Sequence, residues 1–178
     1  MRKLILLLFS ICFVSVMYSQ EQVYGIKFGT TKEDAKSYLE NRVGKYDVVD
    51  DGSTLTVYKQ DFAGINFNIL EFEFEWKGGT AYFNSAAFQK YFAANDVTDA
   101  KECRDFVFEK IKKKYTYYEQ EKNSDGFLRY KFGLNPNDSS KVTGMIDLIR
   151  SKGNDGIERL YLYVVYFPYI QDLGLDDL

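Results

Sequence analysis

The chain has 178 residues, of which 46% are hydrophobic and 28% charged, a composition typical of a folded protein rather than a disordered one. Its formal net charge of −3 argues against the basic surface of a nucleic-acid-binding protein. The sequence contains no histidine, so the commonest general base and the commonest metal ligand are both missing.

The N-terminus has the layout of a secretory signal peptide. Two basic residues precede an apolar run from Leu4 to Val16, and polar residues begin at Ser19, after which cleavage is expected. The run is too short to cross a bilayer core of about 30 Å comfortably as a helix. Lipid attachment at Cys12 is not expected because the preceding residue, Ile11, is not small.

Three regions follow from this assignment: a signal peptide (1–19), a single α+β domain (20–171) and an acidic tail (172–178). We expect an exported protein, periplasmic or extracellular, with no membrane span after cleavage. Only Cys103 would remain in the mature chain, so no intramolecular disulfide is expected.

The first helix is expected from Thr30 to Gly44. Thr30 as N-cap and Glu33 three residues later form a capping box, and Gly44 is a common type of helix stop. Helical spacing then places four apolar residues on one stripe: Ala35, Tyr38, Leu39 and Val43.

A second helix is expected from near Thr98 to about Tyr115. Its apolar stripe consists of Cys103, Phe106, Val107 and Ile111, which predicts an inert, core-facing cysteine. Because Thr30 matches Thr98 and Ala35 matches Cys103, we expect two repeated units, at about 25–90 and 96–168.

Four strands are expected after each helix, separated by turns rich in glycine. Their expected ranges are 46–50, 54–60, 65–76, 80–88, 116–121, 127–134, 142–150 and 158–167. The third of these strands is long enough to require a bend or bulge.

Alternation along the strands predicts which face of the sheet is covered. In the third strand Phe72, Phe74 and Trp76 share one face, and Glu71, Glu73 and Glu75 share the other. The predicted fold class is therefore α+β: two helix-plus-antiparallel-strand units, with the helices packed on one face of the sheet and the other face open.

Residues 25–35, Gly-Ile-Lys-Phe-Gly-Thr-Thr-Lys-Glu-Asp-Ala, resemble the opening of the first helix in small exported bacterial proteins. These include β-lactamase-inhibitory-protein-like domains and, over a shorter stretch, the SmpA/OmlA outer-membrane lipoproteins. The resemblance implies tandem helix-plus-sheet units with an open face. This chain lacks the disulfides of the inhibitor and the lipid-anchor cysteine of the lipoproteins, and no inhibitory residue can be mapped onto it.

No nucleophile, phosphate-loop or dinucleotide motif is present, and no cofactor or metal site is expected. Carboxylate chemistry stays open as an alternative: a glycan-active enzyme would use a pair among Glu71, Glu73, Glu75 and Asp147. We favour a solvated strand face instead, with Glu71, Glu73 and Glu75 paired across the sheet to Lys59, Arg129 or Lys131. The segment 135–140 and the acidic tail offer oxygen ligands, but neither matches a calcium loop.

Tyrosine is abundant, with 15 residues, and it is enriched at protein interfaces. In the last strand Tyr161 and Tyr163 alternate with Leu160 and Leu162, so they fall on the open face. The preferred hypothesis is a binding module, not an enzyme, that engages a protein or peptide through this face. The candidate binding residues are Glu73, Arg129, Lys131, Tyr161 and Tyr163. A structural envelope component is the other alternative.

Overall fold

The structure, a computed structural model, describes residues 22–115, 118–133 and 142–168. The predicted signal peptide, the 135–140 segment and the acidic tail lie outside these residues. In chain order the elements are β1 (Gln22–Val23), β2 (Ile26–Lys27), α2 (Lys32–Val43), the 3-10 helix η1 (Lys45–Asp47), β3 (Val48–Asp50), β4 (Thr54–Phe62), β5 (Ile65–Lys77), β6 (Thr80–Ala93), α3 (Val97–Lys112), β7 (Tyr118–Lys122), β8 (Leu128–Phe132), β9 (Gly144–Lys152) and β10 (Glu158–Tyr166).

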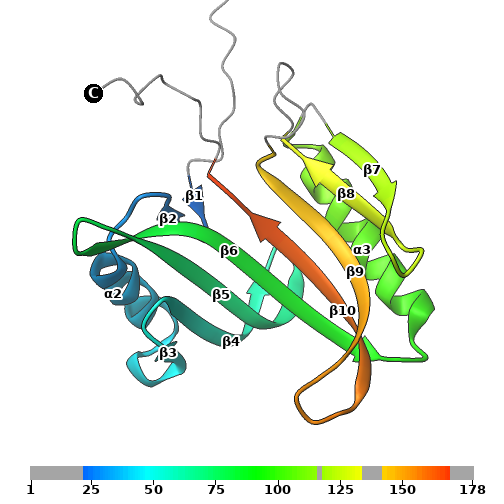
Figure 1. The fold of residues 1–178 in the computed structure, drawn as a ribbon, viewed down its shortest axis with the longest axis horizontal. Coiled ribbons are helices and arrows are strands. Elements are labelled where there is room, and N and C mark those ends of the chain that lie inside the picture. Colours follow the sequence, from blue (N-terminus) through cyan, green and yellow to red (C-terminus); the bar gives the residue numbers. More distant parts are fainter. Residues whose placement is uncertain (1–21, 116–117, 134–141, 169–178) are drawn as a thin grey trace, which may run out of the picture.

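Eight of the strands form one antiparallel sheet in the order β3-β4-β5-β6-β10-β9-β8-β7 (Figure 1). Strands β6 and β10 pair at its centre, from Ala86 opposite Tyr166 to Ala93 opposite Arg159. The remaining strands, β1 and β2, form a small sheet of their own. The expected α+β class with an antiparallel sheet is confirmed, and each of the eight predicted strands has a counterpart in the large sheet.

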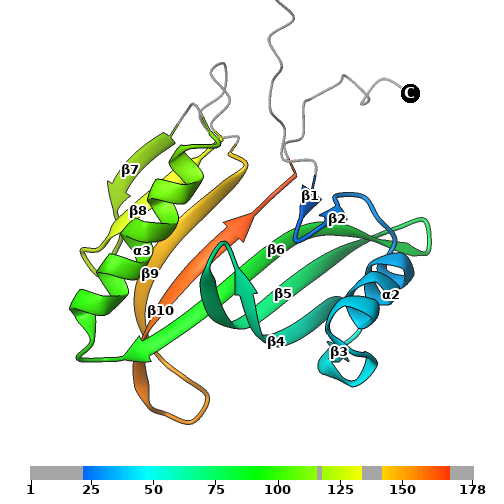
Figure 2. The ribbon, with the colours of Figure 1, turned by 180° about the vertical axis from the view of Figure 1, so that it is seen from behind.

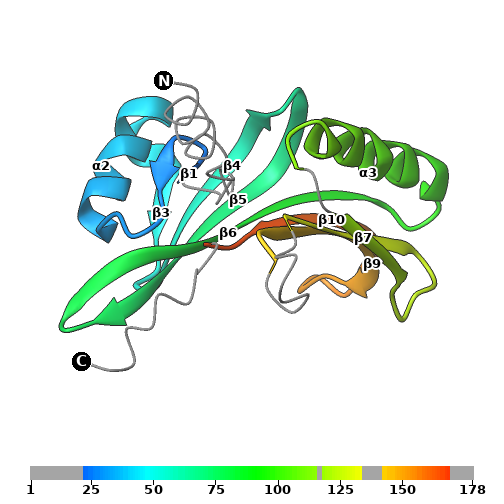
Figure 3. The same ribbon diagram turned by 90° about the horizontal axis from the view of Figure 1, so that it is seen from above.

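Both helices lie on the same side of the large sheet (Figures 2 and 3). Helix α2 contacts β6 and β3, and α3 contacts β6, β8, β9 and β10. We call the opposite side of the sheet the open face, because no described helix covers it. Apolar side chains alternate along the strands toward the helices, so the core forms between the helices and the sheet. Its fully buried side chains include Leu55, Leu70, Phe72, Phe88, Phe132, Ile146, Leu148, Leu160 and Leu162.

Helix α2 begins one residue later than the capping-box pattern predicted. Its N-cap is Thr31, whose side-chain oxygen accepts a hydrogen bond from the Asp34 amide at 3.2 Å. Thr30 is not available as a cap because its carbonyl accepts from the Phe83 amide of β6. Pairing with the sheet thus fixes where the helix starts.

The stripe predicted for α3 was only partly right. Val107 and Ile111 are buried as expected and Cys103 is half-buried, but Phe106 is 44% exposed and Phe108 packs inward instead. The ring of Phe108 stacks on Tyr130 of β8 with the centroids 4.0 Å apart. Several overlapping stripes are possible on this apolar-rich helix, and contact with β8 selects the one that contains Phe108.

The buried stripe of α3 also contains a charged residue. Arg104 is 4% exposed, and its guanidinium donates to the Leu128 carbonyl and contacts the Asp105 carboxylate.

Helix α3 begins earlier than predicted. Its N-cap is Asp96 rather than Thr98, so the predicted correspondence of Thr30 with Thr98 as helix N-caps is wrong.

Strand β5 carries the irregularity that its length suggested. Its pairing with β6 shifts register between Glu73 and Phe74. Phe72 and Phe74 are buried as predicted, but Trp76 is 62% exposed. Trp76 lies beside the β5–β6 turn at the end of the hairpin. Alternation places its side chain on the same face as Phe72 and Phe74, but a side chain is buried only where another element packs over it.

Candidate functional site

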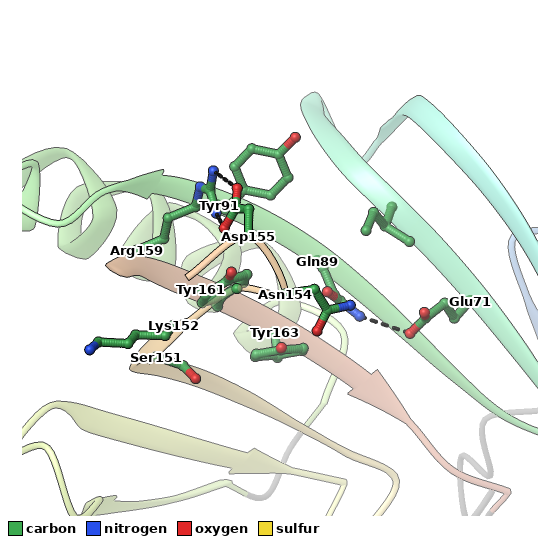
Figure 4. Close-up of a pocket in the computed structure, with 12 residues that line it drawn as sticks. Glu71, Gln89, Tyr91, Ser151, Lys152, Asn154, Asp155, Arg159, Tyr161 and Tyr163 are labelled. Atoms are coloured by element: carbon green, nitrogen blue, oxygen red, sulfur yellow. Dashed lines mark hydrogen bonds and ion pairs between the residues drawn. The ribbon is translucent and has the colours of Figure 1, made fainter. Parts of the chain in front are cut away.

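A hollow of about 560 Å³ lies on the open face, where four strands and the β9–β10 turn meet (Figure 4). We call it the tyrosine hollow. It is lined by Ile69 and Glu71 of β5, Gln89 and Tyr91 of β6, Ser151 and Lys152 of β9, Gly153, Asn154 and Asp155 of the turn, and Arg159, Tyr161 and Tyr163 of β10.

Three tyrosine rings, together with Ile69, form the apolar part of this hollow. Tyr161 and Tyr163 are half-buried neighbours on β10, with ring centroids 6.1 Å apart, and Tyr91 lies 6.3 Å from Tyr161 across the strand pair. Their positions follow from the burial of Leu160, Leu162 and Val164 on the other side of β10, which turns the alternate residues outward. Burial raises the pKa of the Tyr163 hydroxyl, which therefore stays protonated at neutral pH.

The β9–β10 turn is held at the rim of the hollow by an ion pair. The Arg159 guanidinium donates to both oxygens of Asp155, at 2.8 and 2.6 Å. These bonds, together with the Ile157 amide, lower the pKa of the Asp155 carboxyl to about 2. A β-carbon at Gly153 would lie 2.9 Å from the Tyr161 hydroxyl oxygen, so the glycine leaves room for the Tyr161 side chain as it lies in the hollow.

Glu71 supplies the second carboxylate of the hollow. Its Oε2 accepts a hydrogen bond from the Gln89 side chain at 2.8 Å. Burial raises the pKa of Glu71, opposite in direction to the shift of Asp155. The hollow thus combines aromatic rings, side-chain amides and one desolvated carboxyl group.

The five residues predicted for binding share the open face, but the hollow brings only two of them together. Tyr161 and Tyr163 line it, whereas Glu73 is exposed and accepts a hydrogen bond from Ser85 at 2.5 Å. Arg129 and Lys131 lie on β8, which β9 separates from β10.

Arg129 and Lys131 belong to a charge network of the sheet. Arg129 contacts Asp147 at 2.5 Å and Glu121 at 3.4 Å, and Lys131 contacts Glu121 at 3.2 Å. The hydrogen bonds that Arg129 donates to Asp147 raise the pKa of Arg129, and the bond that Lys131 donates to Glu121 lowers the pKa of Glu121. Asn123 completes the network by donating to Asp147.

The predicted partners of the β5 acids were wrong. Glu71, Glu73 and Glu75 contact Gln89, Ser85 and Lys77, respectively, and not Lys59, Arg129 or Lys131. Strands β6, β10 and β9 stand between β5 and β8, so Arg129 and Lys131 cannot reach those acids.

Sequence reasoning missed Tyr91, Gln89 and the turn residues. The fourth strand was expected to end at residue 88, but β6 continues to Ala93. The alternation Phe88, Lys90, Phe92 against Gln89 and Tyr91 would have signalled this extension. Its pairing with β10, which places Tyr91 beside Tyr161, joins segments too distant in sequence for a local pattern to show.

Among the described residues, no group of three or more Cys, Asp or Glu side chains is placed to hold a metal ion. No helix in the described ranges is long and apolar enough to cross a membrane. Comparison of the chain with family models, with curated proteins and with solved structures found no match.

Proposed function

We propose that this protein is an exported binding module that engages a protein or peptide through the tyrosine hollow of its open face. The observation that carries the proposal is the cluster of Tyr91, Tyr161 and Tyr163 around one concave site. Such rings provide a large, rigid contact area at a low cost in conformational entropy, which makes tyrosine a frequent interface anchor.

The polar groups of the hollow give it the means to select a ligand. Gln89 and Asn154 present amide donors and acceptors, and Glu71 presents a desolvated carboxyl group. A peptide offers complementary backbone amides and basic or aromatic side chains, and a hollow of about 560 Å³ accommodates a few residues. The bidentate Arg159–Asp155 pair keeps the rim preformed.

Export and domain layout form part of the same proposal. The signal-peptide pattern of residues 1–19 favours a periplasmic or extracellular location. The order of the sheet favours two tandem units, because the four strands after α2 and the four after α3 meet through their last members, β6 and β10. This layout agrees with the proposed likeness to β-lactamase-inhibitory-protein-like domains and, more weakly, to the SmpA/OmlA lipoproteins.

The alternative of a glycan-active enzyme has Glu71 in its favour, since a raised carboxyl pKa suits a general acid. Such an enzyme also needs a second carboxylate near Glu71, and the described residues provide no suitable one. Asp147 is bound to Arg129, and both oxygens of Asp155 are taken by Arg159. Glu73 and Glu75 are exposed on the same strand. Non-catalytic binding therefore explains the hollow better than catalysis does. A purely structural role would not require a hollow lined by aromatic and polar side chains.

A random peptide display library and a glycan array, both probed with the mature protein, test the proposal. We expect peptides to be selected and their binding to be lost in the Tyr161→Ala/Tyr163→Ala variant. A suitable control is Tyr46→Ala, because Tyr46 is 97% exposed on η1, away from the hollow.

Selected peptides that bind the double variant and the Tyr46→Ala variant equally well would contradict the assignment of the face. Glycan binding without peptide binding would favour the carbohydrate alternative. No binding to either collection would leave the structural role as the better explanation.

A further inference from the structure

A second hollow, of about 400 Å³, lies on the helix side of the sheet, opposite the tyrosine hollow. The ends of both helices, the β1–β2 turn, the β4–β5 turn and the end of β10 surround it. We call it the basic hollow. It is lined by Gln22, Val23, Tyr24, Gly25, Arg42, Phe62, Ala63, Lys110, Ile111, Lys114, Tyr115 and Tyr166.

Three of the lining residues are cationic, and none of the described lining residues is an acid. Arg42 has only neutral partners: it stacks 3.9 Å from the Tyr24 ring and donates to the Tyr38 hydroxyl at 3.0 Å and to the Tyr24 carbonyl. Lys110 lies 5.0 Å from the Phe106 ring, and neither Lys110 nor Arg42 forms an ion pair with a described residue. Burial lowers the pKa of the third cation, Lys114.

Basic residues in the last turn of a helix are common, because they complement the helix dipole. The cations alone would therefore not identify a site. The second observation is Tyr166, which is 5% exposed and whose hydroxyl has no hydrogen-bond partner among the described residues. Its ring packs against Phe62, Phe88 and Phe132, which fixes the side chain in the wall of the hollow.

A buried hydroxyl without a partner is costly, and a native protein rarely retains one without a reason. Burial raises the pKa of Tyr166, so its hydroxyl remains a donor at neutral pH. A donor beside several cations requires an acceptor that carries negative charge. The rest of the lining, which includes Val23, Phe62 and Ile111, is apolar.

We propose that the basic hollow binds an organic anion, a carboxylate on an apolar body. The carboxylate accepts hydrogen bonds from Arg42, Lys110 and the Tyr166 hydroxyl. The apolar body packs against Val23, Phe62 and Ile111. This site is independent of the proposed function, because it lies on the other side of the sheet.

Calorimetric titration of the mature protein with octanoate, and with 1-octanol as its neutral counterpart, tests the proposal. We expect octanoate to bind at one site and octanol to bind at least about ten-fold more weakly. Lys110→Gln should weaken octanoate binding about 3- to 10-fold. Lys113→Gln is the control, because the exposed Lys113 follows α3 without lining the hollow, and this variant should bind like the wild type.

Tyr166→Phe separates a binding role from a structural one. Because the hydroxyl has no partner in the described protein, its removal should leave the free energy of unfolding unchanged or higher, while octanoate affinity falls several-fold. A loss of stability with unchanged affinity would overturn the proposal.

Two sources can supply the carboxylate, a free amphiphile or the chain's own acidic tail. The Asp172→Asn/Asp176→Asn/Asp177→Asn variant distinguishes them: octanoate binds this variant more tightly than the wild type if the tail competes, and equally if it does not. No octanoate binding to either protein would overturn the proposal, as would equal effects of Lys110→Gln and Lys113→Gln. The Tyr161→Ala/Tyr163→Ala variant should bind octanoate like the wild type. Failure of the anion-binding proposal can therefore be distinguished from failure of the proposed function.

Discussion

At the scale of single residues, the tyrosine hollow sets two carboxyl groups in opposite electrostatic environments. Asp155 is bound by Arg159, which stabilises its charged form, whereas Glu71 is half-buried with an uncharged partner, Gln89. The pKa of Asp155 is lowered and that of Glu71 is raised. One acid therefore maintains the shape of the rim, and the other presents a group whose charge a ligand can stabilise.

Glu71→Gln should change how stability depends on pH. Because folding raises the pKa of Glu71, the folded protein holds this proton more tightly, and stability falls as pH rises from the unfolded value through the folded one. The Glu71→Gln variant does not lose stability in this way, and its side-chain oxygen can still accept the hydrogen bond from Gln89. Urea unfolding should show the variant gaining stability over the wild type as the pH rises from about 4, near the ordinary pKa of a glutamate, towards neutral.

The control for this experiment is Glu73→Gln, since Glu73 is exposed on the same strand. Its stability relative to the wild type should be less dependent on pH over the same range. If the two variants shifted equally with pH, burial of Glu71 would not be the cause.

At the scale of elements, local sequence predicted the two helices and the eight strands of the large sheet but not their details. The cap of α2 moved from Thr30 to Thr31 because the Thr30 carbonyl pairs with Phe83, a contact outside the local pattern. The buried stripe of α3 shifted to include Phe108 because Tyr130 lies beneath it. Periodicity therefore identified the elements, and tertiary contacts decided their ends and faces.

Thr31→Ala should destabilise the protein by about 0.5–2 kcal/mol, because the Asp34 amide at the start of α2 loses its acceptor. Thr30→Ala is a matched control one residue earlier, because the Thr30 side chain forms no hydrogen bond with any residue that the structure describes. Chemical denaturation of both variants measures the difference. A larger loss in Thr30→Ala would mean that the helix begins where the sequence pattern placed it.

At the scale of the whole molecule, the pairing of β6 with β10 joins β3–β6 and β7–β10 into the large sheet and brings together the strands that line the tyrosine hollow. It places Tyr91 opposite Tyr161 and Gln89 opposite Tyr163. The sequence indicated that Tyr161 and Tyr163 face outward, but it gave no sign of which strand lies beside them. For the same reason Arg129 and Lys131 were grouped with these tyrosines although β9 separates them.

A continuous sheet of this kind should unfold as one unit. Leu162 is fully buried in β10, so Leu162→Ala should cost about 2–5 kcal/mol. Hydrogen exchange should show an equal loss of amide protection in β5 and in β9, which lie on opposite sides of the central β6–β10 pair. Val165→Ala, at a half-buried position on the open face, should cost less. Loss of protection confined to β9 and its neighbours would show that the two halves unfold separately.

Affinity capture is the most direct test of a binding role for the tyrosine hollow. The tagged mature protein, its Tyr161→Ala/Tyr163→Ala variant and its Tyr46→Ala variant would be incubated in parallel with envelope and culture-fluid extracts of the source cells, and bound proteins quantified by mass spectrometry. We expect a stoichiometric partner on the wild-type protein and on Tyr46→Ala, reduced at least about ten-fold on the double variant, as for the loss of paired aromatic anchors. A partner retained equally by all three proteins would contradict the role of the hollow in binding.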